Sequence, residues 1–241
     1  MIRFKNIHCD YCQKALSGQF LMIRDWKFCM SHAQLPNCFA CGFLVDAPRS
    51  DDYIQCETCS QRGIYDKRQG KPYFEDIIEW LKHENISFGD FPLSFKFGDL
   101  HELAQLSNGQ DILGACFREN TYIEGQSRPQ VKIKGVVVLE GLPPELFAVT
   151  CVHELAHVWF GIKKIKSQPL WLEEGFCELW AYRFSLWKGT KEYKWRAETI
   201  MQSDDPVYGV GFQRMYSYTK KNSFGTLLDA LINRKPIQIK L

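Results

Sequence analysis

The 241-residue sequence has no apolar run of the length that a membrane helix needs, about 20 residues. Its N-terminus, MIRFKNIHCDYC, also lacks the apolar core of a signal peptide. A basic block is missing as well: 30 Lys and Arg are balanced by 28 Asp and Glu, which leaves a formal charge of +2. We therefore expect a cytoplasmic protein that binds neither membrane nor nucleic acid.

The ten cysteines are concentrated near the N-terminus. Seven lie in the first 59 residues, six of them in three Cys-x-x-Cys pairs and the seventh in a Cys-x-x-His pair. In a reducing compartment this pattern indicates metal binding rather than disulfides. The other three, Cys116, Cys151 and Cys177, stand in apolar stretches and are predicted to be buried core thiols.

The four ligand pairs are enough for two closed zinc sites, since a structural zinc is held by four Cys or His ligands with no open position. If adjacent pairs combine, as in LIM domains, the first zinc has Cys9, Cys12, Cys29 and His32 as ligands, and the second has Cys38, Cys41, Cys56 and Cys59. A cross-braced arrangement, as in RING domains, would join the first pair with the third and the second with the fourth. The spacing of the pairs does not exclude it.

Two domains are predicted. Residues 1–62 are rich in Cys and turns and poor in apolar periodicity, so metal must supply much of their stability. The polar segment 61–72, closed by Pro72, is predicted to be a linker. Residues 63–241 then form a packed domain.

The second domain mixes strands and helices, so the fold class is α+β. Strands are predicted in FPLSFKF from Phe91 and in VKIKGVVVLEGL from Val131, and a helix is predicted around Phe74 to Leu81. Further helices are predicted at about 143–161, 171–188, 191–202, 209–220 and 223–233.

The strongest motif is VTCVHELAHVWFG. His153 and His157 are four residues apart, so they share one face of a helix and can hold a single ion, with Glu154 beside them. A strand and a turn precede this helix, and a second helix with paired carboxylates follows it, which is the order of elements in gluzincin peptidases. A catalytic zinc has three protein ligands and an open position for water. The third ligand is therefore expected on the second helix.

Glu173 and Glu174 compete for the role of third ligand. The string WLEEGF resembles WLNEGF of the large aminopeptidase family, in which the residue before Gly is the ligand. Glu174 is therefore predicted to bind the metal, and Glu173 to face elsewhere. Glu178 lies one turn beyond Glu174, where it is predicted to accept the other ring N–H of a ligand histidine. An ordinary solvated glutamate is the alternative.

These residues predict hydrolysis of a peptide bond. Zinc lowers the pKa of its bound water and polarises the scissile carbonyl, while Glu154 takes the proton of the water and passes it to the leaving amine. The oxyanion that forms needs a further donor. Tyr208, in DDPVYGVGF, is the candidate, with Tyr216 and Tyr218 behind it. A packed aromatic residue is the alternative for Tyr208.

Several strings together resemble one family, the LIM-domain zinc metallopeptidases of the plant growth-regulator type, called the DA-one family. They are Cys29-Met-Ser-His32, LGACFREN, GLP before the active helix, HExxH followed by EEG, and YGxGF at Tyr208. The resemblance implies the sequential LIM arrangement and an endopeptidase that cuts protein substrates. It also implies His153, His157 and Glu174 as zinc ligands and Glu154 as general base. Three zinc ions per chain are then expected, one catalytic and two structural.

Other functions stay open. The enzymatic alternative is an aminopeptidase, although GVVVLEG holds Glu140 without the Gly-x-Met-Glu-Asn string that grips a free N-terminus. A binding adapter with a latent peptidase fold is another, and a RING-type ubiquitin ligase is a third. The LIM-like module is expected to serve regulation or to bind a partner or substrate. The plant members carry ubiquitin-interacting helices and a first LIM domain that this sequence lacks, so ubiquitin as a partner is left open.

Overall fold

The computed structural model describes residues 7–46, 53–106, 112–121, 130–165, 168–235 and 237. The chain divides into two compact units, Met1–Gly63 with Gly141–Pro143 and Ile64–Glu140 with Pro144–Leu241. Among the described residues, no helix combines the length and the apolar character that a membrane span requires.

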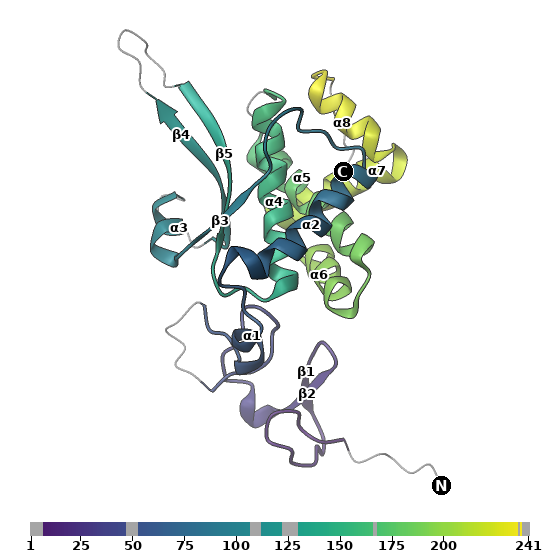
Figure 1. The fold of residues 1–241 in the computed structure, drawn as a ribbon. Helices are drawn as coiled ribbons and strands as arrows, with labels where there is room; N and C mark the ends of the chain where they lie inside the picture. The colour runs from purple at the N-terminus through teal and green to yellow at the C-terminus, as the bar shows by residue number, and fades with distance from the viewer. Residues whose placement is uncertain are drawn as a thin grey trace. The chain divides into compact units, whose positions relative to one another are not determined.

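The first unit has little regular structure (Figure 1). Its elements are β1 (Phe20–Ile23), β2 (Trp26–Cys29), the 3-10 helix η1 (Met30–His32) and α1 (Glu57–Gln61). Strands β1 and β2 form an antiparallel hairpin. The central cluster of buried residues consists of Cys9, Phe28 and Leu44, with partly buried aliphatic, aromatic and cysteine side chains around it. So small a core contributes little hydrophobic stabilisation.

A three-stranded sheet forms one part of the second unit (Figure 1). Its strands are β3 (Phe95–Gly98), β4 (Gly114–Thr121) and β5 (Gln130–Leu139), in the order β3-β5-β4. The central strand β5 is parallel to β3 and antiparallel to β4. The predicted strand from Phe91 is shorter than expected, since it begins only at Phe95. Pro92 has no N–H to donate to a ladder, which favours the late start.

The helices form the rest of the second unit. They are α2 (Lys67–His83), α3 (Leu100–Leu106), α4 (Pro144–Ile162), α5 (Leu170–Lys188), α6 (Lys191–Gln202), α7 (Tyr208–Lys221) and α8 (Phe224–Ile232). The ends of α4 to α8 lie within one residue of those predicted, and the α+β class is confirmed. Helix α4 packs against β5 and against α5. It is buried on nearly all sides, which agrees with its largely apolar sequence.

The predicted linker 61–72 is wrong over its second half, because α2 begins at Lys67. The Asp66 side chain accepts a hydrogen bond from the backbone N–H of Gln69 at 2.9 Å, and the Gln69 side chain accepts one from the N–H of Asp66 at 3.2 Å. This reciprocal capping box starts the helix. Pro72 lies inside α2, whose apolar face is buried. The burial of that face outweighs the one backbone hydrogen bond that a proline removes.

Two glycines let α5 and α7 approach each other closely. A Cβ atom on Gly175 would lie 2.1 Å from the carbonyl carbon of Gly211, and one on Gly211 would lie 2.1 Å from the carbonyl oxygen of Trp171. Neither distance is possible for a side chain, so the helices can pack in this way only with glycine at both positions. Since Tyr208 is the first residue of α7, this packing also sets its position.

Candidate metal centres and active site

Three side-chain donors converge between α4 and α5. His153 and His157 lie one turn apart on α4, with ring centroids 5.3 Å from each other. The Oε2 atom of Glu174, on α5, lies 3.2 Å from Nε2 of His153 and 3.4 Å from Nε2 of His157. Only 8% of Glu174 is exposed. One carboxylate oxygen therefore faces both imidazoles.

This spacing fits a tetrahedral metal ion. Nitrogen and oxygen donors about 2.0–2.2 Å from a tetrahedral zinc lie about 3.4 Å from one another. The separations of 3.2 and 3.4 Å between Glu174 and the two histidines agree with that value. The spacing of Glu174 to each histidine is thus that of two ligands of one zinc ion, which makes His153, His157 and Glu174 candidate zinc ligands.

The remaining nitrogen of each histidine also has a carboxylate partner. Oε1 of Glu178 lies 3.1 Å from Nδ1 of His153, as predicted, and Oε1 of Glu173 lies 2.9 Å from Nδ1 of His157. The expectation that Glu173 faces elsewhere is wrong. At about 100° per residue, the three glutamates span an arc of about 140° on α5, and the two histidines of α4 contact all three. With a metal ion bound, a proton kept on each Nδ1 by its carboxylate partner would leave the Nε2 lone pair of each ring available to the ion.

The carboxylates dominate the electrostatics of the site. Burial lowers the pKa of His153, but hydrogen bonds to Glu174 and Glu178 outweigh burial and raise this pKa well above its usual value. Burial raises the pKa of Glu174, yet hydrogen bonds to His153 and His157 lower it to about 2. With Glu173, three carboxylates surround two imidazoles. A divalent cation at the Nε2 atoms would balance this excess of negative charge.

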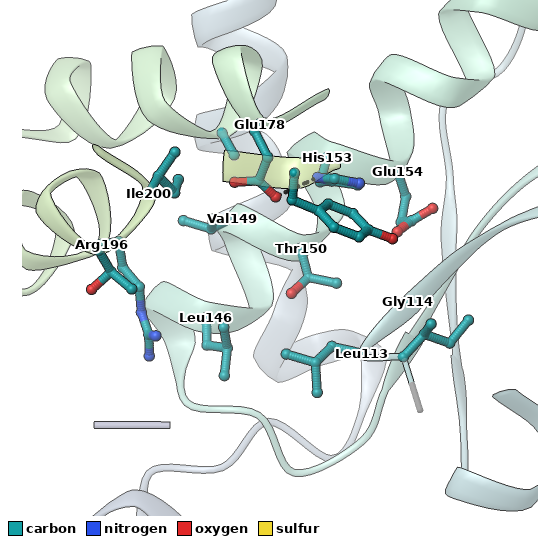
Figure 2. Close-up of a pocket in the computed structure, with 14 residues that line it drawn as sticks. Leu113, Gly114, Leu146, Val149, Thr150, His153, Glu154, Glu178, Arg196 and Ile200 are labelled. Atoms are coloured by element: carbon teal, nitrogen blue, oxygen red, sulfur yellow. Dashed lines mark ion pairs between the residues drawn. The ribbon is translucent and has the colours of Figure 1, made fainter. Parts of the chain in front are cut away.

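Glu154 lies beside these donors, next to the backbone of β4. It is 8% exposed, and burial raises the pKa of its carboxyl group. The backbone N–H of Cys116 donates a hydrogen bond to it. Glu154 also lines a cavity together with His153 (Figure 2). Its position leaves it free to accept a proton from a molecule bound in that cavity.

Tyr208 lies on the same cavity, with its ring centroid 6.2 Å from that of His153. Burial, together with the charge of Glu174, raises the pKa of Tyr208 to about 12, so the hydroxyl keeps its proton and can donate a hydrogen bond at neutral pH. Tyr216, by contrast, stacks on Phe212 and contacts Tyr182 within an aromatic cluster. Of these two tyrosines, Tyr208 is the better placed to act as a donor.

Cys177 is a neighbour of the site that the motif did not predict. It is fully buried on α5, and its Sγ lies within 4.8 Å of a nitrogen of each histidine. Burial raises the pKa of the Cys177 thiol, which disfavours the thiolate that a metal needs. The Glu174 carboxylate, with its pKa of about 2, carries the negative charge that a metal ion attracts, so Glu174 stays the predicted third donor. Cys151 is buried as predicted, whereas Cys116 is partly exposed and does not fit the prediction of a buried thiol.

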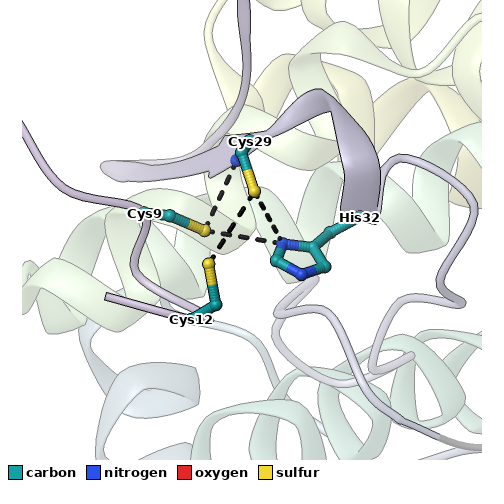
Figure 3. Close-up of side chains that lie close together, drawn as sticks. All are labelled: Cys9, Cys12, Cys29 and His32. Atoms are coloured by element: carbon teal, nitrogen blue, oxygen red, sulfur yellow. Dashed lines mark hydrogen bonds between the residues drawn. The ribbon is translucent and has the colours of Figure 1, made fainter. Parts of the chain in front are cut away.

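The first unit holds a cluster of four side chains that point toward one another (Figure 3). Its members are Cys9, Cys12, Cys29 and His32. Sγ of Cys12 lies 3.8 Å from Sγ of Cys29, and Sγ of Cys9 lies 3.6 Å from Nδ1 of His32. Two sulfurs on a tetrahedral zinc lie about 3.8 Å apart, and a sulfur and a nitrogen about 3.6 Å apart. The cluster therefore fits a closed zinc site.

A second cluster of four cysteines has the same character. It consists of Cys38, Cys41, Cys56 and Cys59, whose sulfurs all lie within 4.8 Å of one another. Sγ of Cys41 lies 3.7 Å from Sγ of Cys56, which is again the tetrahedral spacing. In both clusters the ligand pairs that are adjacent in sequence come together. This is the sequential grouping of LIM domains, not the cross-braced grouping of RING domains.

Comparison with known proteins agrees with these features. A family model described as "DA1-like: Protein DA1" matches residues 114–194, which run from β4 to the start of α6 and include all three donors of the second unit. No solved structure matches the chain.

Curated plant proteins also match. Protein DA1-related 7 of Arabidopsis thaliana is 20% identical over 93% of this chain and 52% of its own length. LIM domain-containing protein HDR3 of Oryza sativa subsp. japonica is 22% identical over 74% of this chain and 45% of its own length. Protein DA1 of Arabidopsis thaliana is 19% identical, over 73% of this chain and 41% of its own length. The chain thus spans about half the length of these relatives. The predicted resemblance to the DA1-like family is confirmed.

Proposed function

We propose that the second unit is a zinc-dependent endopeptidase domain of the gluzincin type that hydrolyses peptide bonds of protein substrates. The observation that carries this proposal is the convergence of His153, His157 and Glu174 at metal-ligand spacing, with Glu154 beside them on the same cavity. A closed structural site has four protein ligands, whereas three donors at a cavity leave room for water. The similarity to the DA1-like family supports the same reading.

The chemistry divides among the residues of this cavity. A bound zinc ion supplies a Lewis acid and lowers the pKa of its water. Glu154 accepts the proton of the attacking water and delivers it to the leaving amine. The Tyr208 hydroxyl donates a hydrogen bond to the oxygen on which negative charge develops. Glu173 and Glu178 hold the two imidazoles in the orientation that directs Nε2 toward the metal.

The first unit is proposed to be a LIM-like module with two structural zinc ions, which binds a protein partner or substrate and so regulates the peptidase. The two closed clusters of four Cys or His ligands support this assignment, as does a relative whose name includes a LIM domain. The full cofactor complement is then three zinc ions per chain.

The proposed function is tested by metal content and cleavage together. Purified protein should contain about three zinc ions by elemental analysis, and it should cut unfolded protein substrates at internal bonds, as N-terminal labelling of the products would reveal. A mild chelator should remove one zinc first and stop cleavage, since an open three-ligand site exchanges more readily than a closed one. Re-addition of zinc should restore cleavage.

Other results would contradict parts of this proposal. Two zinc ions and no cleavage of any substrate would support the adapter with a latent peptidase fold. Removal of single residues from free N-termini would support the aminopeptidase. Glu140, which stands in the string GVVVLEG that lacks the Gly-x-Met-Glu-Asn pattern of aminopeptidases, is exposed and is not among the residues that line the cavity.

Glu173→Ala is expected to lower the zinc affinity of the catalytic site by about 10- to 100-fold, because it removes the hydrogen-bond acceptor of His157 Nδ1. Competition with a chromophoric chelator measures this affinity. Glu173→Gln, which keeps an acceptor oxygen, is the matched control and should bind zinc more tightly than Glu173→Ala. Zinc affinity equal to wild type in Glu173→Ala would show that the contact does not support the metal.

A further inference from the structure

A cavity of about 380 Å³ opens beside the proposed catalytic donors, wholly within the second unit. Its polar groups near the metal site, His153, Glu154, Glu178 and Tyr208, already have roles in the proposed chemistry. The rest of its wall has no part in that chemistry. A volume of this size lies at the lower end of ligand pockets, which hold roughly 300–1,000 Å³. It therefore fits one large side chain with the adjoining peptide group.

Aliphatic side chains dominate the rest of the wall. Leu146 and Val149 come from α4, before the metal-binding turn, Ile200 comes from α6, and Leu113 precedes β4. Leu146 and Val149 are 7% and 8% exposed. Figure 2 shows Val149 between Ile200 and His153, so the aliphatic wall continues directly into the metal site. A substrate whose scissile bond lies at the donors would place a neighbouring side chain against this wall.

We propose that this cavity binds one large apolar side chain, such as Leu, Met or Phe, of the residue next to the scissile bond, and so sets the cleavage preference of the enzyme. This inference rests on the proposed peptidase function, because only a peptidase has a scissile bond at the donors. Burial of such a side chain against aliphatic walls strengthens binding by about 10- to 100-fold relative to Ala. The cavity thereby selects unfolded or extended segments that expose an apolar residue.

Arg196 offers a competing reading, because it also lines the cavity and would attract an acidic side chain. Its guanidinium carbon lies 4.4 Å from the ring centroid of Trp195. In Figure 2 it lies on the side of Leu146 and Val149 that is away from Glu154. The aliphatic wall lies between Arg196 and the metal site. An apolar side chain is the better fit to the part of the cavity next to the metal site.

Binding to the zinc-loaded Glu154→Gln protein tests the inference without cleavage. The probes are peptides of Gly and Ala with blocked ends and a single variable residue, which is Phe, Leu, Ala or Glu. The variable side chain then determines which residue of the peptide enters the cavity. Calorimetric titration should give Kd values about 10- to 100-fold lower for Phe and Leu than for Ala. Equal Kd values would overturn the inference, and so would tightest binding of the Glu peptide, which would assign the cavity to Arg196.

Variants that fill the cavity complete the test. Val149→Phe should abolish most of the preference for the Phe peptide over the Ala peptide. Ile200→Phe should have the same effect, and it serves as the second variant because its half-buried position tolerates a larger ring. Leu186→Phe adds the same ring at an exposed position of α5 outside the cavity and should keep the preference. Full preference in both cavity variants would refute the inference. The proposed function is tested separately: if wild-type protein cuts no substrate, that function is wrong, whichever peptides bind to the cavity.

Discussion

Glu154→Gln is expected to lower kcat/KM for peptide hydrolysis by about 10²- to 10⁴-fold while the zinc content stays at the wild-type value. Glutamine has nearly the same shape, and its amide oxygen can still accept the hydrogen bond from Cys116 N–H, so the fold should persist. It cannot take a proton from water at neutral pH. Steady-state kinetics on a quenched peptide, with elemental analysis of the same sample, measure both quantities.

Two matched variants separate chemistry from metal binding. Glu140→Gln makes the same change at an exposed residue just after β5 and should leave the rate unchanged. Glu174→Ala removes a donor that lies 3.2 Å from His153 Nε2, so this variant should lose both the catalytic zinc and the activity. Full activity in Glu154→Gln would contradict the proposed peptidase mechanism, because no other carboxylate of the site is placed to act as the base.

The helices around the site could be predicted closely because their apolar periodicity and their boundary residues predict the same helix ends. Helix α5 ends at Lys188 with Gly189 in a left-handed conformation, at φ 66°, which is the ordinary glycine stop signal. The start of α2 falls inside the predicted linker although Asp66 and Gln69 have capping-box spacing, because Pro72 favours the end of a linker over the interior of a helix. A local stop signal was outweighed here by burial of the apolar face.

The metal donors could be predicted from spacing, but the carboxylates around them only in part. His153 and His157 share a helix face by periodicity alone. Which edge of α5 meets α4 depends on how the two helices pack. A single sequence does not specify the rotation of one helix about its axis relative to the other. The contact of Glu173 with His157 follows from the packing and was missed for that reason. The grouping of the four N-terminal ligand pairs likewise depends on the path of the chain between them.

Cys38→Ser is expected to unfold the first unit and to release its two structural zinc ions. Cys38 is 1% exposed and belongs to the second closed cluster, so a serine there leaves three thiols around the metal. Structural zinc sites contribute roughly 10–16 kcal/mol in small zinc-binding peptides. The buried cluster around Phe28 is too small to replace that contribution. Hydrogen exchange resolved by mass spectrometry should show lost protection in residues 7–46 and 53–63.

The same experiment tests whether the two units fold independently. Since the helices α4 to α8 belong to a separate compact unit with its own core, their exchange protection should stay at the wild-type level in Cys38→Ser. Thr58→Ala changes an exposed residue between Cys56 and Cys59 and should preserve both the zinc and the protection of the first unit. Loss of protection in α4 and α5 as well would show that the chain unfolds as one cooperative unit, and the module could then no longer be treated as a separate zinc-stabilised domain.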